Sequence, residues 1–272
     1  MFGKASLSRE MLQLPSYWWK VWRGRDRRMT VERIRYGKQH RQYILFCPDV
    51  RGELQGQVIF IHGGAWHFGR PEMFLSHARV LNDWGYRVFL PSFRRPPLYN
   101  FSHISRDLKA VMAELNSYRK ERLPTFLGGM SSGGHLAALI AFDTRILSEA
   151  DWSARDLSGV FTLGAPLDLS QMPSSLLLSS LFGFGRIDRR QADPRRLLKT
   201  AEPVSVLCVQ ADGDGLVPVA SAEAFVREYK RCMAGEIRYH LIDNSTHLDT
   251  AGWFMPDNRA NPIVRDFLSN SG

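Results

Sequence analysis

Two glycine-framed turns contain the residue types that an acyl-transfer enzyme needs most. The first spans residues 62–66, reads His-Gly-Gly-Ala-Trp and follows the apolar run 58–61. Its two glycines leave backbone N–H groups free to face a ligand. The second spans residues 129–133, reads Gly-Met-Ser-Ser-Gly and follows another short apolar run. Together the two turns predict an oxyanion hole and a serine nucleophile.

Ser131 is the predicted nucleophile of the second turn. A serine at the tip of a strand-to-helix turn needs residues without side chains two positions before and after it, because a side chain there would clash with the adjoining strand and helix. Gly129 and Gly133 meet that need for Ser131, whereas Ser132 has Met130 two positions before it. The apolar segment after the turn predicts a buried helix, whose N-terminal end favours negative charge beside Ser131.

A serine hydroxyl is a weak nucleophile near neutral pH, so it needs a base and a carboxylate that orients the base. Among the eight histidines, His247 is the favoured base because it follows the last predicted strand on a short polar loop. Asp214 is the favoured carboxylate and Asp212 the alternative, since both lie in the loop after the preceding strand. His62 belongs to the first turn, and we expect its ring to brace that turn by a hydrogen bond.

Alternating strands and helices predict an α/β fold, in which helices cover both faces of a mostly parallel sheet. Apolar patterning places strands at 31–36, 42–47, 58–61, 86–91, 125–129, 159–164, 204–210 and 236–242. Helical spacing of apolar residues places helices at 73–84, 102–119, 133–147 and 220–233. Sites in such sheets form beyond the carboxyl ends of the strands, and both glycine turns lie at such ends.

Length and composition favour a single domain, 1–272, because 272 residues with 44% hydrophobic side chains can form one substantial core. The three widely separated cysteines show no metal-ligand spacing and favour a reducing compartment, and the N-terminus lacks the apolar core of a signal peptide. We therefore expect a soluble, cytoplasmic protein without a metal. The net charge of +9 is interpreted as a solvated basic surface rather than a nucleic-acid-binding one.

The segment 1–30 combines an aromatic cluster at 17–22 with arginines that continue beyond it. We expect an N-terminal helix that packs on the body of the protein or roofs the active site. The alternative is weak peripheral contact with a membrane, since interleaved tryptophan and arginine side chains suit a lipid headgroup layer.

The chain resembles the α/β-hydrolase superfamily, in the branch of small carboxylesterases and arylformamidases that has a His-Gly-Gly-x-Trp motif. The similarity runs from residue 35 to His247 and leaves out the first thirty residues and a segment from about 171 to 202. The order Ser131, Asp214, His247 is that of the superfamily. The resemblance implies an α/β-hydrolase fold with an eight-stranded sheet, a small cap inserted at 168–202, and no cofactor.

The resemblance also implies which residues stabilise the oxyanion. The donors are expected to be the backbone N–H groups of Gly64 and Ala65, joined by that of Ser132. Trp66 is expected to pack beneath the first turn rather than take part in chemistry. The substrate-binding residues expected near the turn are His62, Gly63, Trp66 and Phe68, with Phe74 and Phe182 as further apolar lining.

The sequence therefore predicts a serine hydrolase that cleaves carboxylic esters of small molecules through an acyl-enzyme. An arylformamidase, which removes a formyl group from an aromatic amine, is the alternative within the same chemistry. An alternative of another class is a non-catalytic module that binds a membrane or nucleic acid through its basic face. Oligomeric state is left open.

Overall fold

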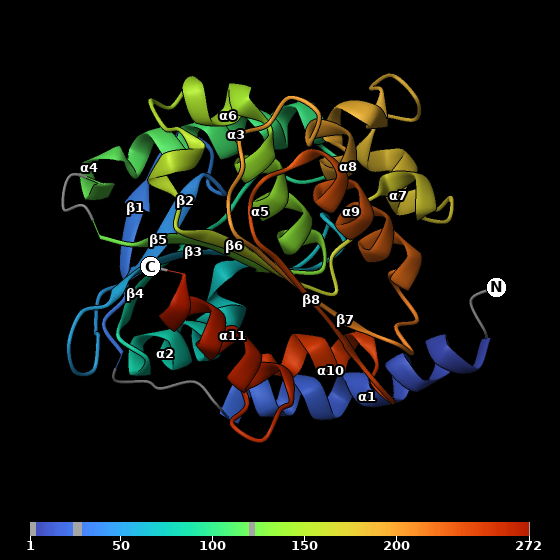
Figure 1. Ribbon diagram of the computed structural model, residues 1–272, viewed down its shortest axis with the longest axis horizontal. Coiled ribbons are helices and arrows are strands. Elements are labelled where there is room, and N and C mark those ends of the chain that lie inside the picture. The colour runs from blue at the N-terminus through green and yellow to red at the C-terminus, as the bar shows by residue number, and fades with distance from the viewer. Residues whose placement is uncertain (1–3, 24–28, 120–122, 272) are drawn as a thin grey trace.

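The centre of the protein is an eight-stranded sheet in the order β1-β2-β4-β3-β5-β6-β7-β8 (Figure 1). The computed structural model describes residues 4–23, 29–119 and 123–271. The strands are β1 (Glu32–Arg35), β2 (Tyr43–Cys47), β3 (Gly56–Ile61), β4 (Tyr86–Pro91), β5 (Thr125–Met130), β6 (Gly159–Leu163), β7 (Val206–Ala211) and β8 (Ile237–Ile242). Only β2 runs antiparallel to its neighbours β1 and β4, and the other neighbouring strands are parallel. The mostly parallel sheet and α/β-hydrolase fold predicted from the sequence are confirmed.

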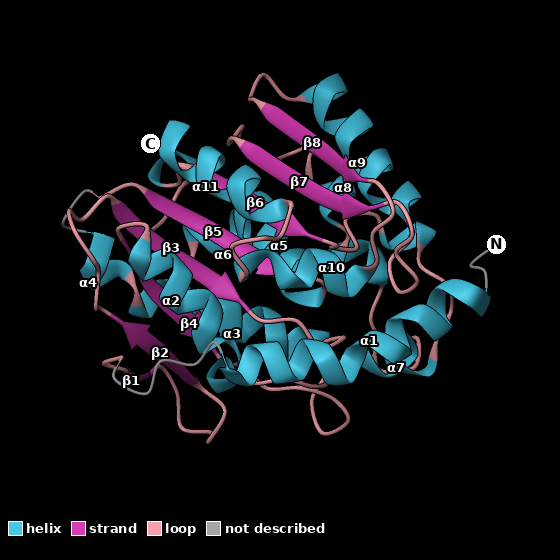
Figure 2. Ribbon diagram, turned by 90° about the horizontal axis from the view of Figure 1, so that it is seen from below, coloured by secondary structure: helices cyan, strands magenta, loops and turns pink. Residues whose placement is uncertain are grey.

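Two hydrophobic cores lie on opposite faces of this sheet. Successive side chains of a strand point to opposite faces, so Ile59 and Ile61 enter one core while Val58 and Phe60 enter the other. The helices α3 (Phe101–Glu114), α5 (Ser132–Phe142) and α9 (Val219–Cys232) cover the first face. The helices α1 (Lys4–Arg23), α2 (Leu75–Asp83), α10 (His247–Ala251) and α11 (Ala260–Asn270) cover the second (Figure 2). The central strands are therefore buried on both sides, which explains their continuous apolar runs.

Two of the predicted helices are each divided in the structure. The helix expected at 102–119 ends at Glu114, and a separate short helix, α4 (Asn116–Arg119), follows it. The helix expected at 133–147 ends at Phe142, because Asp143 adopts an extended backbone and caps a new helix, α6 (Thr144–Ser148). The Asp143 side chain accepts the backbone N–H of Arg145 at 3.1 Å. Apolar spacing continues across this break, so periodicity alone does not reveal it.

The aromatic N-terminal segment forms the expected helix over the residues that the structure describes there. In α1, Tyr17 and Val21 are buried in the second core, whereas part of the arginine-rich continuation, 24–28, lies outside the described residues. The predicted cap insertion contains only short helices, the longest being α7 (Leu176–Leu181) and α8 (Pro194–Leu197). Within the described ranges, no helix is long and apolar enough to span a bilayer.

Candidate active site

Ser131 lies in a sharp turn between β5 and α5, with the left-handed backbone angles φ 53° and ψ −128°. Its own N–H is held by the carbonyl of Leu163 at 2.7 Å. A Cβ on Gly129 would lie 2.5 Å from the backbone of Gly133, and one on Gly133 would lie 2.0 Å from the carbonyl oxygen of Ile61. The two flanking glycines are therefore required by close backbone contact, as the sequence predicted.

The first glycine turn follows β3 and places its backbone amides beside Ser131, at the carboxyl ends of the strands. Gly64 has φ +130°, and a Cβ there would lie 2.4 Å from the carbonyl oxygen of Phe68. Ala65 and Trp66 also have positive φ angles, 50° and 63°, which non-glycine residues adopt only when the surrounding structure holds them. Within the described ranges, no protein group accepts the N–H of Gly64, Ala65 or Ser132. These three donors are thus available to a ligand in the adjoining cavity.

His247 and Asp214 are joined by a short hydrogen bond in the interior. His247 Nδ1 lies 2.8 Å from Asp214 Oδ2, and both side chains are almost fully buried. The other oxygen, Oδ1, accepts the backbone N–H groups of Leu216 at 2.9 Å and Val217 at 2.7 Å. Asp212, the alternative carboxylate, instead accepts the N–H of Ser245 at 3.1 Å. The structure therefore pairs the histidine with Asp214.

The side chain of Gln210, a residue that the sequence analysis did not identify, supports this arrangement. Its Nε2 donates to Asp214 Oδ2 at 3.0 Å, so this carboxylate oxygen has two donors. The bond from Gln210 to Oδ2 and the two backbone bonds to Oδ1 hold the plane of the carboxylate. They thereby fix the direction from which His247 can approach Oδ2. Because Gln210 is the next-to-last residue of β7, its position on the sheet follows from the strand register.

The environment of His247 raises the pKa of its imidazole above the ordinary value of 6.5. Burial acts in the opposite direction and lowers the pKa. The negative charge and the hydrogen bond of Asp214, together with the charge of Glu10, outweigh burial. Since Asp214 engages Nδ1, Nε2 is the ring nitrogen that remains for exchange of a proton.

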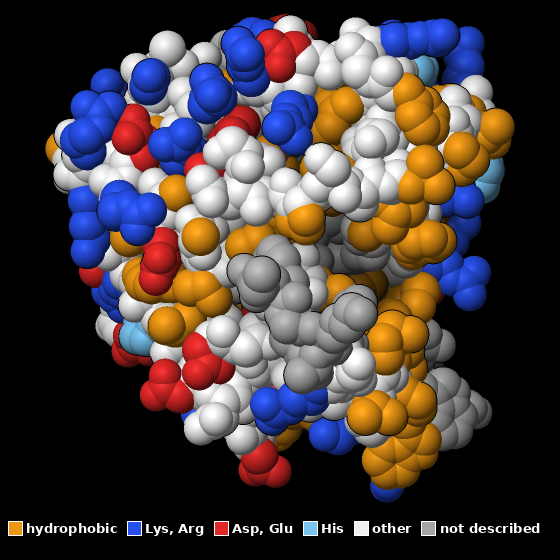
Figure 3. Space-filling model, turned by 90° about the vertical axis from the view of Figure 1, so that its right-hand side faces the viewer, with side chains coloured by type: hydrophobic (Ala, Val, Ile, Leu, Met, Phe, Trp, Pro, Cys, Tyr) orange, Lys and Arg blue, Asp and Glu red, His pale blue; other side chains and the backbone are white. Residues whose placement is uncertain are grey.

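Ser131 and His247 line one cavity of about 520 Å³ beyond the carboxyl ends of the strands. Gly63, Gly64, Ala65 and Ser132 line it as well. Its remaining walls are mainly apolar and include side chains of α1, α7 and the loops after β3 and β7; these are Leu14, Tyr17, Trp18, Trp66, Phe68, Met73, Phe74, Met130, Met172, Leu177, Leu178, Leu216, Val217 and Leu248. Figure 3 looks at this side of the molecule and shows hydrophobic side chains gathered on it.

Four large hydrophobic residues that line the cavity are also exposed and so lie at its mouth: Trp18, Phe68, Leu177 and Leu216. Trp18 and Leu14 belong to α1, so the N-terminal helix forms part of the wall, as expected for a roof over the site. The sequence analysis did not name Leu14 and Trp18 as lining. The signal for Leu14 was the spacing of residues 10, 14, 17 and 21, which lie on one helix face.

One expected substrate-binding side chain, His62, and one expected lining side chain, Phe182, lie elsewhere. His62 is buried beneath its turn, where Nδ1 hydrogen-bonds the carbonyl of Gly63 at 2.8 Å and the ring stacks on Phe93. Burial lowers its pKa to about 3, so it is a neutral brace of the loop. Phe182 packs against Phe101 in the first core. Neither His62 nor Phe182 is among the described residues that line the cavity, so these two expectations were wrong.

Trp66 combines both roles that the sequence suggested. Its ring is 5% exposed, lines the cavity, and donates from Nε1 to His135 Nδ1 at 3.1 Å. His135 in turn bonds the carbonyl of Ala192 through Nε2 at 2.7 Å. This chain of contacts connects the first turn to α5 and to the predicted cap, and it fixes the position of the turn.

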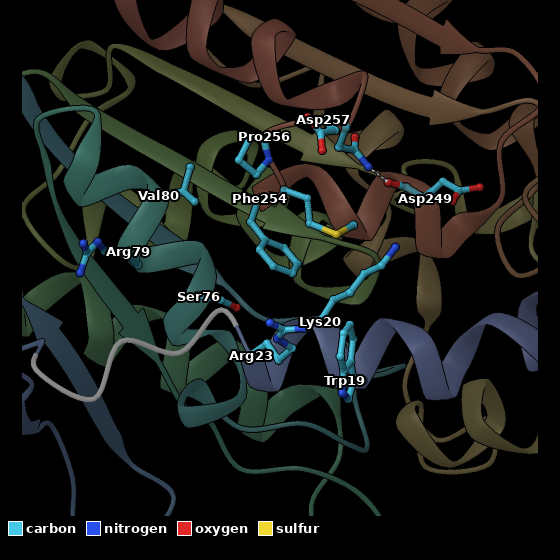
Figure 4. A pocket seen from close by; sticks show the side chains of 12 residues that line it. Trp19, Lys20, Arg23, Ser76, Arg79, Val80, Asp249, Phe254, Pro256 and Asp257 are labelled. Carbon is cyan, nitrogen blue, oxygen red and sulfur yellow. Dashed lines mark hydrogen bonds between the residues drawn. The ribbon is translucent and has the colours of Figure 1, made fainter.

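A second cavity, of about 620 Å³, lies on the other side of α1 (Figure 4). It is bordered by Trp19, Lys20 and Arg23 of α1 and by Phe254 in the segment after α10. None of the residues predicted to act in catalysis lines this cavity. The helix α1 therefore separates the Ser131 cavity from a more open one.

Comparison with known proteins gives relatives at the level of family and fold. The BD-FAE family model matches residues 45–229. A probable isoprenylcysteine alpha-carbonyl methylesterase of Oryza sativa subsp. japonica is 24% identical over 238 residues, which cover 79% of this chain and 56% of that protein. The chain thus spans about half the length of this curated relative.

Solved esterase structures share the whole architecture. Esterase B from Lactobacillus rhamnosis superposes with a TM-score of 0.76 at 18% identity, covering 98% of this chain and 96% of that one. A truncated carbohydrate esterase from gut microbiota superposes with a TM-score of 0.73 at 17% identity, covering 89% of this chain and 96% of that one. Since the BD-FAE model matches more than half of the chain, the protein belongs to the BD-FAE family and has the fold of the α/β-hydrolases.

Proposed function

We propose that this protein is a carboxylic ester hydrolase in which Ser131, His247 and Asp214 act as a catalytic triad. The observation that supports this most strongly is the 2.8 Å bond between His247 Nδ1 and Asp214 Oδ2, in a cavity that Ser131 also lines. The family and the esterases among its structural relatives favour the same reaction class.

The proposed reaction proceeds through an acyl-enzyme. Ser131 Oγ forms a bond to the ester carbonyl carbon while His247 Nε2 accepts the hydroxyl proton, and Asp214 stabilises the imidazolium. The negative charge on the carbonyl oxygen is stabilised by the N–H groups of Gly64, Ala65 and Ser132. His247 then donates the proton to the leaving alcohol as the ester C–O bond breaks. Water, deprotonated by the same histidine, hydrolyses the acyl-enzyme and restores Ser131.

The cavity favours esters with apolar groups of small to medium size. Its walls are aromatic and aliphatic, and about 520 Å³ is in the usual range of small-molecule sites. Phe68 and Leu216 at the mouth extend the apolar surface outward. These residues suit an acyl or alcohol group that leaves water on binding.

Labelling with a fluorophosphonate probe tests this proposal. We expect the wild type to be labelled and Ser131→Ala to remain unlabelled, because the probe reacts only with an activated serine. An unchanged melting temperature of Ser131→Ala would show that the fold is retained. Ser148→Ala, which removes an exposed hydroxyl on α6 away from the cavity, is the matched control and should still be labelled. A wild type that does not react with the probe would contradict the proposed hydrolase and would favour the non-catalytic binding module.

The choice between ester and formamide is tested by substrate comparison. We expect kcat/KM for a short aryl ester to exceed that for N-formylkynurenine. The reverse order would make the protein an arylformamidase that uses the same residues. Membrane contact of α1 remains a separate proposal, and sedimentation with anionic vesicles at low and high salt tests it.

A further inference from the structure

Glu10 is a buried carboxylate in the middle of α1, with an exposed fraction of only 2%. It is the one acidic residue within that helix. Oε1 accepts the backbone N–H of His247 at 2.6 Å and that of Gly215 at 3.1 Å, and Oε2 accepts the N–H of Leu248 at 3.2 Å. A buried carboxylate is costly unless its oxygens are hydrogen-bonded, and here three backbone donors surround it.

These donors belong to the two segments that hold His247, the proposed base, and Asp214, the carboxylate that orients it. Gly215 directly follows Asp214, and His247 is the first residue of α10. The first N–H groups of a helix have no partner within the helix, so a carboxylate beside them is stabilised by hydrogen bonds and by the helix dipole. Glu10 thus hydrogen-bonds both the loop after β7, which contains Asp214, and helix α10, which begins at His247.

Contacts that do not involve Glu10 hold α1 in place. Tyr17 and Val21 are buried in the second core, and the Tyr17 hydroxyl lies 3.8 Å from Met130 Sδ. The Thr246 hydroxyl donates to Gln13 Oε1. In Figure 1, α1 runs directly beneath α10. The loss of one carboxylate should therefore leave the helix docked on the protein.

We propose that Glu10 is a positioning residue of the active site, which fixes His247 relative to Asp214 by bonding the backbone of both segments. This inference rests on the proposed function. It assigns a role in catalysis to the N-terminal helix, which lies outside the region matched by the family model, 45–229.

The charge of Glu10 also acts on the imidazole. Asp214 and Glu10 are the charged groups that raise the pKa of His247 against the effect of burial. Asp249, on the same helix, is turned to the N–H and hydroxyl of Thr246 instead. Removal of the Glu10 charge should therefore lower the pKa of His247 and move the acidic limb of the kcat/KM profile to lower pH, since the neutral imidazole is the active form.

The variant Glu10→Gln tests the inference, because it removes the charge and puts an N–H₂ group where a backbone donor needs an oxygen. We expect kcat to fall about ten- to a hundredfold, the usual effect of a small misplacement of a catalytic group, with KM changed less than kcat. The acidic limb should move to lower pH. Glu114→Gln, an exposed glutamate on α3, removes the same charge and is the matched control, which should change neither quantity.

Glu10→Asp separates geometry from charge. It keeps the negative charge but shortens the side chain by one methylene, so kcat should fall while the acidic limb stays closer to that of the wild type. Thermal unfolding of each variant checks that the fold is retained. If the kcat of Glu10→Gln stays within twofold of the wild type and its limb does not move, the positioning role is refuted.

Titration of the His247 ring by NMR separates this inference from the proposed function, because it needs no substrate. We expect a lower pKa in Glu10→Gln than in the wild type and in Glu114→Gln. If that shift appears in a protein that does not react with the fluorophosphonate probe, the positioning of His247 by Glu10 is supported and the hydrolase proposal is contradicted. An unchanged pKa in a reactive protein refutes the electrostatic role of Glu10 and leaves the hydrolase proposal standing.

Discussion

Replacement of Asp214 by asparagine should reverse the proton arrangement of His247 with little effect on the fold. Asp214 Oδ1 accepts two backbone N–H groups, from Leu216 and Val217, so the amide oxygen of Asn must occupy that position. The amide N–H₂ then faces His247 Nδ1, which must become an acceptor, and the ring proton moves to Nε2. An imidazole protonated at Nε2 cannot accept the proton of Ser131.

The size of the effect follows from this tautomer. A triad with its histidine in the wrong tautomer loses about 10⁴-fold in kcat, and each tenfold loss corresponds to about 1.4 kcal/mol of barrier. We therefore expect Asp214→Asn to lose roughly 10³- to 10⁴-fold in kcat/KM, which is about 4 to 5.5 kcal/mol. Stability should fall by about 1 to 3 kcal/mol, since the bonds from Leu216 and Val217 are kept but the Gln210 amide loses its acceptor.

The assay compares Asp214→Asn with Asp212→Asn on a short aryl ester. Asp212 lies two residues away and accepts a backbone N–H instead of bonding the histidine, so Asp212→Asn should stay within about tenfold of the wild type. Thermal unfolding checks that both variants are folded. If Asp214→Asn is folded and also stays within tenfold of the wild type, or if the two variants lose activity equally, the assignment of Asp214 is refuted.

Two further predictions concern the base and the nucleophile turn. The pKa of His247 is raised above 6.5, and only the neutral ring can act as a base. The value of kcat/KM should therefore fall as the pH falls through a midpoint above 6.5. A pH profile with a midpoint below 6.5 would contradict this. Gly133→Ala would place a Cβ 2.0 Å from the carbonyl oxygen of Ile61, so it should destabilise the protein by about 1 to 3 kcal/mol or more and lower the melting temperature by several degrees. Gly52→Ala, whose Cβ would have nothing within 4 Å, strains only the backbone, at φ +83°. It should therefore lower the melting temperature less than Gly133→Ala, and equal melting temperatures for the two variants would refute the steric argument.

Local patterns predicted the strands and the nucleophile turn because their causes are local. Alternating and continuous apolar runs reflect burial on the two faces of a sheet, and all eight predicted strands are present with ends shifted by at most two residues. The glycines around Ser131 are required by contacts within the strand-turn-helix unit and with the neighbouring strand. Residue types at fixed spacing are enough to identify such a unit.

Helix breaks and pocket walls were harder to predict from the sequence. The break at Asp143 depends on a cap that competes with continued apolar periodicity. Phe182 was expected in the pocket because it is aromatic, yet it packs on Phe101 in the core. Hydrophobicity shows that a side chain is buried, but it does not show which surface buries it.

By itself, the sequence determined the class of fold, the serine in its turn and the histidine after the last strand, because each depends on spacing along the chain. Only the tertiary structure decided between Asp214 and Asp212, which differ in sequence by two positions but point to different partners. It also placed Glu10 against His247, 237 residues away along the chain. The physical reason is that a hydrogen bond depends on direction and distance in space, and these follow from the packing of whole elements rather than from any local pattern.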